Sequence, residues 1–230
     1  MNVKDIVPSK LKCASNNLPI KRRSKGEKTR ERILIAAIEV LALNGVKGTT
    51  HRAIASHADL QLSLTTYYFK DIQELIHQAF KLNSKRILSH ADPVLETALN
   101  ILTEVPKKDL RKTATKLALC EQLANMAKLH LVDTIKHQAI PLTVEQLMFT
   151  ETQVSPTLRT LSQEHELAQL IPYEKLCCFF NKHNPEVDAK IMYTVFSQLR
   201  YSQLYKQVNI DTLQIEQTVR RIIAWIMSIR

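Results

Sequence analysis

Glycine is the residue that this sequence lacks most clearly, with only 3 among 230 residues. Sheets and tight turns usually need more glycine than this, whereas helices do not. Hydrophobic residues make up 45% of the chain, which is enough to build a real core. We therefore expect an all-α fold.

Long apolar runs are also missing. No uninterrupted apolar stretch approaches the ~20 residues that cross a bilayer. Residues 1–17 contain no apolar segment of the kind found in secretory signals. We therefore expect a cytoplasmic protein that has no membrane partner.

Cysteine is present but not in a pattern that binds metal. The four cysteines, Cys13, Cys120, Cys177 and Cys178, form no C-x-x-C pair, and no histidine cluster has zinc-finger spacing. The sequence also contains no nucleophile elbow, no phosphate-binding loop and no metal triad. We expect reduced thiols, no metal, no cofactor and no enzymatic activity, with a thiol redox sensor as the alternative role for the cysteines.

Positive charge is abundant and is concentrated at one end of the chain. Residues 1–90 hold 16 Lys and Arg against 7 Asp and Glu, whereas residues 91–230 hold 16 against 15. A basic N-terminal third on a nearly neutral body indicates that an anionic polymer binds at that end.

Hydrophobic periodicity and capping residues divide the N-terminal part into helices. Asn44-Gly45 is a helix stop, Thr50 can cap the helix that follows, and Asp71 has Glu74 at capping-box spacing. The predicted helices cover residues 28–45, 51–57 and 61–68, and a fourth begins after Asp71.

Beyond residue 90 we expect the prolines to separate helices, because proline breaks the helical hydrogen-bond pattern. The longest unbroken run covers residues 108–137, and the last two helices cover about 186–206 and 211–229. The prolines concerned are Pro93, Pro106, Pro141, Pro156, Pro172 and Pro185.

Residues 51–68 form a predicted helix-turn-helix, whose second helix would lie in the major groove of DNA. On that helix Thr65 and Tyr68 face the protein, with Leu64 near the edge. The opposite face is small or flat, and its hydroxyl and methyl groups can approach base edges and phosphates closely. This outer face consists of Leu62, Ser63, Thr66 and Tyr67.

The wider segment "TRERILIAAIEVLALNGVKGTTHRAIASHADLQLSLTTYYFKDIQELIHQAF" resembles the TetR family of bacterial transcriptional regulators. The matching patterns are R-x-x-I-L-x-A-A at Arg30–Ala37, N-G-x-x-G-T-T at Asn44–Thr50, R-x-I-A at Arg52–Ala55 and T-T-Y-Y-F at Thr65–Phe69. Two positions depart from the family: Asp59 replaces the usual turn glycine, and Ile72 replaces a lysine that often reaches phosphate.

The resemblance implies an N-terminal three-helix DNA-binding domain and a larger C-terminal helical domain for ligand binding and dimerisation. We expect a basic, disordered leader over residues 1–25, the helix-turn-helix domain over 26–85 and the second domain over 86–230. The DNA-contacting positions that the resemblance implies, with the charged and capping residues at their edges, are Thr50, His51, Arg52, Leu62, Ser63, Leu64, Thr66, Tyr67 and Lys70.

The sequence of the C-terminal domain offers candidates for a ligand pocket and a dimer interface. Glu121 lies in an apolar context and could face a cationic ligand, although a solvated surface position is the alternative. The other pocket candidates, each of which could equally be core, are Cys120, Met126, Phe149 and Tyr173. The predicted dimer face, part of which must be intramolecular core, comprises Ile191, Val195, Gln198, Leu199, Val219, Ile222, Ile223 and Ile226.

These expectations combine into a nucleoid-bound, ligand-responsive dimeric repressor. It would bind a near-palindromic double-stranded DNA operator and leave it when a small-molecule inducer binds, with an efflux-pump gene and a cationic or amphipathic inducer as the predicted target and signal. One alternative is a nucleoid-associated or division-linked DNA-binding protein without an inducer. The other is a helical enzyme that retains a vestigial helix-turn-helix.

Overall fold

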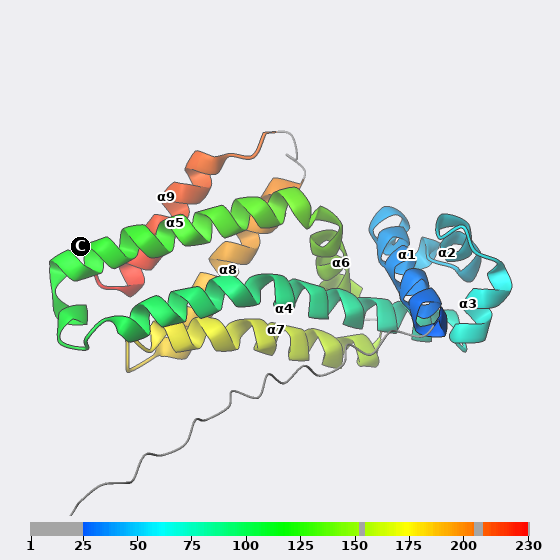
Figure 1. The fold of residues 1–230 in the computed structure, drawn as a ribbon, viewed down its shortest axis with the longest axis horizontal. Coiled ribbons are helices and arrows are strands. Elements are labelled where there is room, and N and C mark those ends of the chain that lie inside the picture. The colour runs from blue at the N-terminus through cyan, green and yellow to red at the C-terminus, as the bar shows by residue number, and fades with distance from the viewer. Residues whose placement is uncertain (1–24, 152–154, 205–208, 230) are drawn as a thin grey trace, which may run out of the picture.

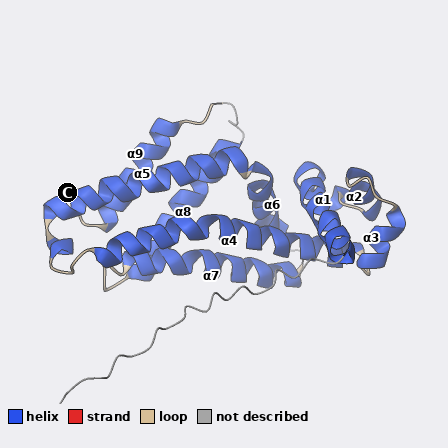
Figure 2. Cartoon of the chain, in the orientation of Figure 1, coloured by secondary structure: helices blue, strands red, loops and turns tan. Residues whose placement is uncertain are grey.

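The computed structural model describes residues 25–151, 155–204 and 209–229, and within these ranges all regular structure is helical (Figure 1, Figure 2). The predicted all-α fold is therefore confirmed. The predicted leader, apart from Lys25, lies outside the described residues.

Three helices form a head at one end of the molecule (Figure 1): α1 (Lys25–Gly48), α2 (His51–His57) and α3 (Leu62–Tyr68). The predicted stop at Asn44-Gly45 is visible as a kink, because Gly45 has a φ of 66°. Left-handed backbone of this kind favours glycine. The Thr49 hydroxyl donates to the Gly45 carbonyl at 2.7 Å and secures the chain after the kink.

Helix α4 (Ile72–Glu104) leaves the head and runs along the rest of the molecule. The Asp71 carboxylate accepts a hydrogen bond from the Glu74 backbone N–H at 2.8 Å, so the predicted N-cap is confirmed. The predicted domain boundary between residues 85 and 86 falls inside this continuous helix.

The remaining helices form the body, in which α4 lies beside α7, α7 beside α8, and α5 beside α9. Helix α6 packs against α1 and α4 and connects the body to the head. Their bounds are η1 (Asp109–Arg111), α5 (Thr113–His137), α6 (Ala139–Thr150), α7 (Pro156–Cys177), α8 (Pro185–Gln203) and α9 (Thr212–Ile226).

The prolines separate helices only in part. Pro156 and Pro185 begin α7 and α8, where a missing N–H costs nothing because the first-turn amides have no helical partner. Pro93 and Pro172, however, lie inside α4 and α7, so the prediction that they end helices is wrong. Packing along the whole length of these helices outweighs the hydrogen bond that each proline removes.

Two hydrophobic cores lie along the molecule. The first is built by α1, α2 and the start of α4, and it continues into α6 and α7 through Val144, Met148, Leu158 and Leu161. The second joins α5, α8 and α9 in the body. The head therefore shares its core with two body helices.

Candidate DNA-binding face and ligand cavity

Helix α3 is anchored by one buried side. Thr65 is fully buried, and its hydroxyl donates to the Leu62 carbonyl at 2.8 Å. Phe69, just after the helix, is also fully buried, and the Arg30 guanidinium lies 4.9 Å from its ring centroid. These contacts fix the rotation of α3 about its axis.

The turn between α2 and α3 is held by α1. Asp59 has a φ of 49°, so aspartate takes a left-handed backbone that glycine more often supplies. Arg32 donates a hydrogen bond to the Ala58 carbonyl at 2.5 Å, and His57 lies 2.7 Å from the Glu39 carboxylate. The sequence patterns gave no signal for this role of Arg32, because it depends on where α1 crosses the turn.

The opposite side of α3 faces solvent. Leu62 is 42% exposed, Tyr67 is 80% exposed, and Ser63 and Thr66 are also exposed, as predicted. The Thr66 hydroxyl donates to the Ser63 carbonyl at 3.1 Å, which leaves its oxygen lone pairs free to accept. This face presents hydroxyl, methyl and ring groups of the kinds that contact base edges and phosphates in other proteins.

The other predicted DNA contacts differ in accessibility. Arg52 and Lys70 are exposed at the ends of the helix-turn-helix, whereas His51 and Leu64 are half-buried. Thr50 is the confirmed N-cap of α2, since its hydroxyl oxygen accepts from the Ala53 N–H at 3.1 Å. Contact with DNA remains a prediction for all of these residues.

The body contains an apolar cavity of about 80 Å³ between α4, α5, α7, α8 and α9. Met126 and Tyr173 line it, as the sequence analysis predicted for a ligand pocket. Most of the other lining residues are aliphatic or aromatic, among them Val94, Leu95, Leu123, Phe180, Phe196 and Ile223.

Three predicted pocket residues lie elsewhere. Glu121 is exposed on α5 and forms an ion pair with Arg220 of α9. Cys120 is buried beside the Arg220 carbonyl and does not line the cavity, and Phe149 packs against the first core beside His165. These placements match the alternatives, a surface position for Glu121 and core positions for Cys120 and Phe149, because helical periodicity alone does not show which side of α5 or α6 faces the cavity.

His130 is a polar lining residue that was not predicted from the sequence. Burial, reinforced by the positive charges of His90 and Arg200, lowers its pKa to about 4. Burial also raises the pKa of the Tyr173 hydroxyl. Both groups are therefore uncharged near neutral pH, and the cavity presents neutral hydrogen-bonding groups in apolar walls.

Comparison with solved structures gives the fold a name. A TetR-family transcriptional regulator from Mesorhizobium loti superposes with a TM-score of 0.66 at 13% identity, covering 90% of this chain and 98% of that one. A member of the TetR family from Streptomyces coelicolor gives 0.59 at 18% identity, covering 85% and 98%. The fatty acid degradation regulator FadR from Bacillus halodurans gives 0.60 at 15% identity, covering 88% and 96%. The chain has the TetR fold. No family model and no curated protein matches the sequence.

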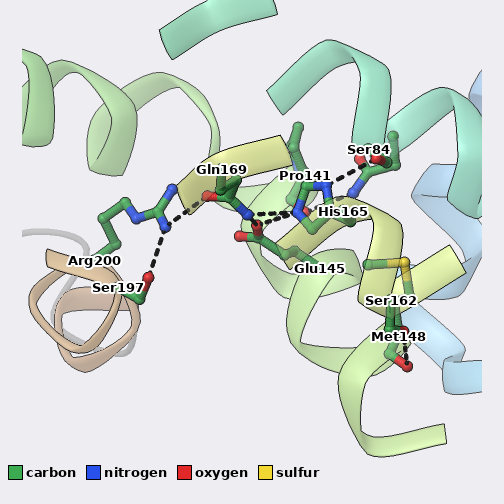
Figure 3. A network of polar contacts seen from close by, with 10 residues as sticks. Ser84, Pro141, Glu145, Met148, Ser162, His165, Gln169, Ser197 and Arg200 are labelled. Atoms are coloured by element: carbon green, nitrogen blue, oxygen red, sulfur yellow. Dashed lines mark hydrogen bonds and ion pairs between the residues drawn. The ribbon is translucent and has the colours of Figure 1, made fainter. Parts of the chain in front are cut away.

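In this TetR fold a buried polar network joins four helices of the body (Figure 3). His165 of α7 lies 2.8 Å from the Ser84 hydroxyl of α4 and 2.6 Å from the Glu145 carboxylate of α6. Gln169 donates to the same carboxylate at 2.8 Å, and Arg200 of α8 donates to the Gln169 carbonyl oxygen at 3.4 Å. The network lies between the cavity helices and α6, which packs against the head.

The charges in this network compensate one another. Burial alone would raise the pKa of Glu145, but the hydrogen bond from His165 and the positive charge of Arg200 lower it below the ordinary value. Burial opposes the charge of Arg200, but Glu145 outweighs that effect and raises the pKa of the guanidinium. Glu145 and Arg200 are therefore both charged inside the protein, and Gln169 bridges them by hydrogen bonds.

The predicted dimer face is only partly available. Leu199, Val219, Ile223 and Ile226 are buried within the single chain, so they belong to the part of the predicted stripe that forms intramolecular core. The accessible residues of α8 and α9 surround a shallow surface groove of about 450 Å³ that includes Val195, Ile222 and the 53% exposed Trp225. Ile191 is half-buried and Gln198 is exposed on the same helix, α8.

No group of three or more His, Cys, Asp or Glu in the described ranges is placed to hold a metal ion. None of the described helices is long and apolar enough to cross a membrane.

Proposed function

We propose that the protein is a transcriptional regulator that binds double-stranded DNA through α3. The observation that carries this proposal is the division of α3 into a buried side with Thr65 and an exposed side with Ser63, Thr66 and Tyr67. A helix that serves only the core does not require exposed hydroxyl and aromatic side chains on its outer side, and here they lie in the basic N-terminal part of the chain. The structural neighbours that share the fold are described as regulators, which supports the proposal.

The regulator acts as a homodimer that binds a near-palindromic operator. An exposed tryptophan is a frequent anchor in protein interfaces, and Trp225 lies beside apolar residues of α8 and α9. Pairing these helices across a two-fold axis presents two heads to half-sites ~34–36 Å apart.

The cavity is the site through which a small molecule releases the repressor. Its lining contains no carboxylate, and Glu121 lies outside it, so the cationic inducer predicted from Glu121 loses its partner. The chemistry of the walls favours an apolar ligand. An efflux-pump gene as the regulated target remains a hypothesis that no residue of the structure supports.

Selection of bound fragments from the source genome tests the function directly. The purified protein is mixed with sheared DNA at low salt, and the retained fragments are sequenced with and without candidate apolar compounds. We expect a few sites that share a near-palindrome and that disappear with one class of compound. Failure to retain any duplex would refute the proposal.

The same experiment separates the alternatives. Many dispersed sites that no compound displaces would indicate a nucleoid-associated protein. Turnover of a small molecule without DNA affinity would indicate an enzyme with a vestigial helix-turn-helix.

A further inference from the structure

A second hollow lies at the end of the molecule opposite the head, where the α4–α5 connection meets the turn after α7. It is a groove of about 650 Å³. We call it the basic groove, and its lining comprises Lys107, Leu110, Arg111, Lys116, Cys178, Phe179, Phe180, Asn181, Lys182 and His183.

Its positive charge is not neutralised by neighbouring carboxylates. The lining contains four Lys or Arg residues and no Asp or Glu. Within the described ranges none of these four cations has a carboxylate partner at ion-pair distance. The two nearby acids are engaged elsewhere, because Asp109 pairs with Lys112 at 2.6 Å and Asp188 accepts from Asn181 at 2.8 Å.

Local structure positions one of the four cations and the turn that carries another. The Lys116 ammonium donates to the Met227 carbonyl at 2.6 Å, near the end of α9, which leaves its other N–H groups for a ligand. Asn181 accepts from the His183 backbone N–H at 2.9 Å and so fixes the turn that carries Lys182. Less conformational entropy is lost when an anion binds cations that are already positioned.

The basic groove adjoins the apolar cavity. Phe180 lines both hollows, and Met227, whose carbonyl holds Lys116, lines the cavity. A ligand with a charged end and an apolar chain would therefore contact the basic groove and the apolar cavity at the same time.

We propose that the basic groove binds the carboxylate or phosphate of an amphipathic anion whose apolar chain enters the cavity beside Phe180. This inference rests on the proposed function, because the ligand class that it names is the one that would release the regulator from DNA. The binding itself is independent of DNA.

Direct calorimetric binding to the full chain tests the inference without DNA. The probes are decanoate, decyl phosphate, decanol and inorganic phosphate. We expect decanoate or decyl phosphate to bind at least about tenfold more tightly than decanol, and the anion that binds more tightly identifies the head group. Equal binding of decanol and both anions, or binding of inorganic phosphate as tight as that of decyl phosphate, would overturn the proposal.

Variants locate the charge contact. Arg111→Gln with Lys182→Gln should weaken binding of the preferred amphipathic anion about tenfold and leave decanol unchanged, whereas the control Lys190→Gln on the exposed side of α8 should change neither. Unchanged anion binding in a double variant that keeps its melting temperature would refute the assignment.

Cys178 supplies a second measurement that does not depend on variants. It is exposed in the basic groove, whereas Cys120 and Cys177 are buried. The bound anion should slow alkylation of Cys178, followed by peptide mass spectrometry, and decanol should not. Alkylation at the same rate with saturating anion would place the ligand elsewhere. Genomic DNA selection with the same preparation shows separately whether the protein binds DNA.

Discussion

Thr65 and Thr66 are adjacent and chemically identical, yet they face opposite environments. Thr65 is fully buried and braces α3, whereas Thr66 is exposed. Successive residues on a helix are rotated by about 100°. The helical register, set by buried Phe69 and Thr65, therefore decides which of the two hydroxyls is exposed.

Arg52 should contribute charge rather than sequence recognition. Arg52→Ala should weaken binding to all duplexes alike, and the slope of log affinity against log salt concentration should fall by about 0.9 for one lost phosphate contact. Fluorescence anisotropy across a salt series measures this, with Lys175→Ala in the body as the control. An unchanged slope would mean that Arg52 does not touch a phosphate.

Thr66 and Tyr67 should contribute sequence recognition. Thr66→Ala or Tyr67→Ala should cost about 1–3 kcal/mol of operator binding and much less of nonspecific binding, because contacts to base edges exist only on the correct sequence. Competition between operator and random duplex measures the difference, and Leu129→Ala on the surface of α5 is the control. Equal losses on both duplexes would show that α3 does not read sequence.

His130 should make stability depend on pH. Its folded pKa of about 4 lies below the ordinary value of 6.5, so the unfolded chain takes up the proton first. The stability that the neutral His130 contributes should therefore be fully present above pH ~6.5. As the pH is lowered from there toward 4, the free energy of unfolding should fall, by up to about 2 kcal/mol at pH 5.

Urea titrations at pH 7, 6 and 5 measure this loss, and His130→Gln should reduce it. Proton NMR of the His130 ring reports its pKa directly. A ring that titrates near pH 6.5 would contradict the effect of burial.

At the scale of whole elements, the network of Glu145, His165, Gln169 and Arg200 links helices that the hydrophobic pattern treats separately. Glu145→Gln removes the negative charge that compensates Arg200 inside the protein. Breaking a buried pair from one side usually costs about 3–5 kcal/mol. We expect a loss of that order in urea unfolding, whereas exposed Glu164→Gln should change stability by less than about 0.5 kcal/mol. A near-neutral Glu145→Gln would mean that the pair contributes no net stability.

The head was predictable because its signals are local. The Thr50 and Asp71 caps, the left-handed Asp59 and the exposed face of α3 each depend on residues within one or two helical turns. The cavity was not, because Met126, Tyr173 and His130 come together only when distant helices pack. Glu121 illustrates the failure, since its apolar neighbours in sequence gave no indication that Arg220 would hold it at the surface.

At the scale of the whole molecule, dimerisation should depend on Trp225. Trp225→Ala should weaken self-association at least about tenfold, because the substitution removes a large exposed ring that would be buried in an apolar interface. Sedimentation equilibrium measures this. Leu167→Ala, which truncates a 61% exposed residue of α7, is the control. A variant that remains as dimeric as the parent would place the interface on another face.

The 33 residues of α4 join the two ends of the molecule without interruption. At 1.5 Å per residue the helix is roughly 50 Å long, so a tilt of about 5° at one end displaces the other by roughly 4 Å. Pro93 cannot donate a backbone hydrogen bond to the Ser89 carbonyl, which makes this point of the helix the easiest to bend, and Ala91 and Val94 on either side line the cavity. A ligand there would press on α4 close to Pro93, where the helix bends most easily. A small motion in the body would then displace the head by several ångströms relative to the DNA.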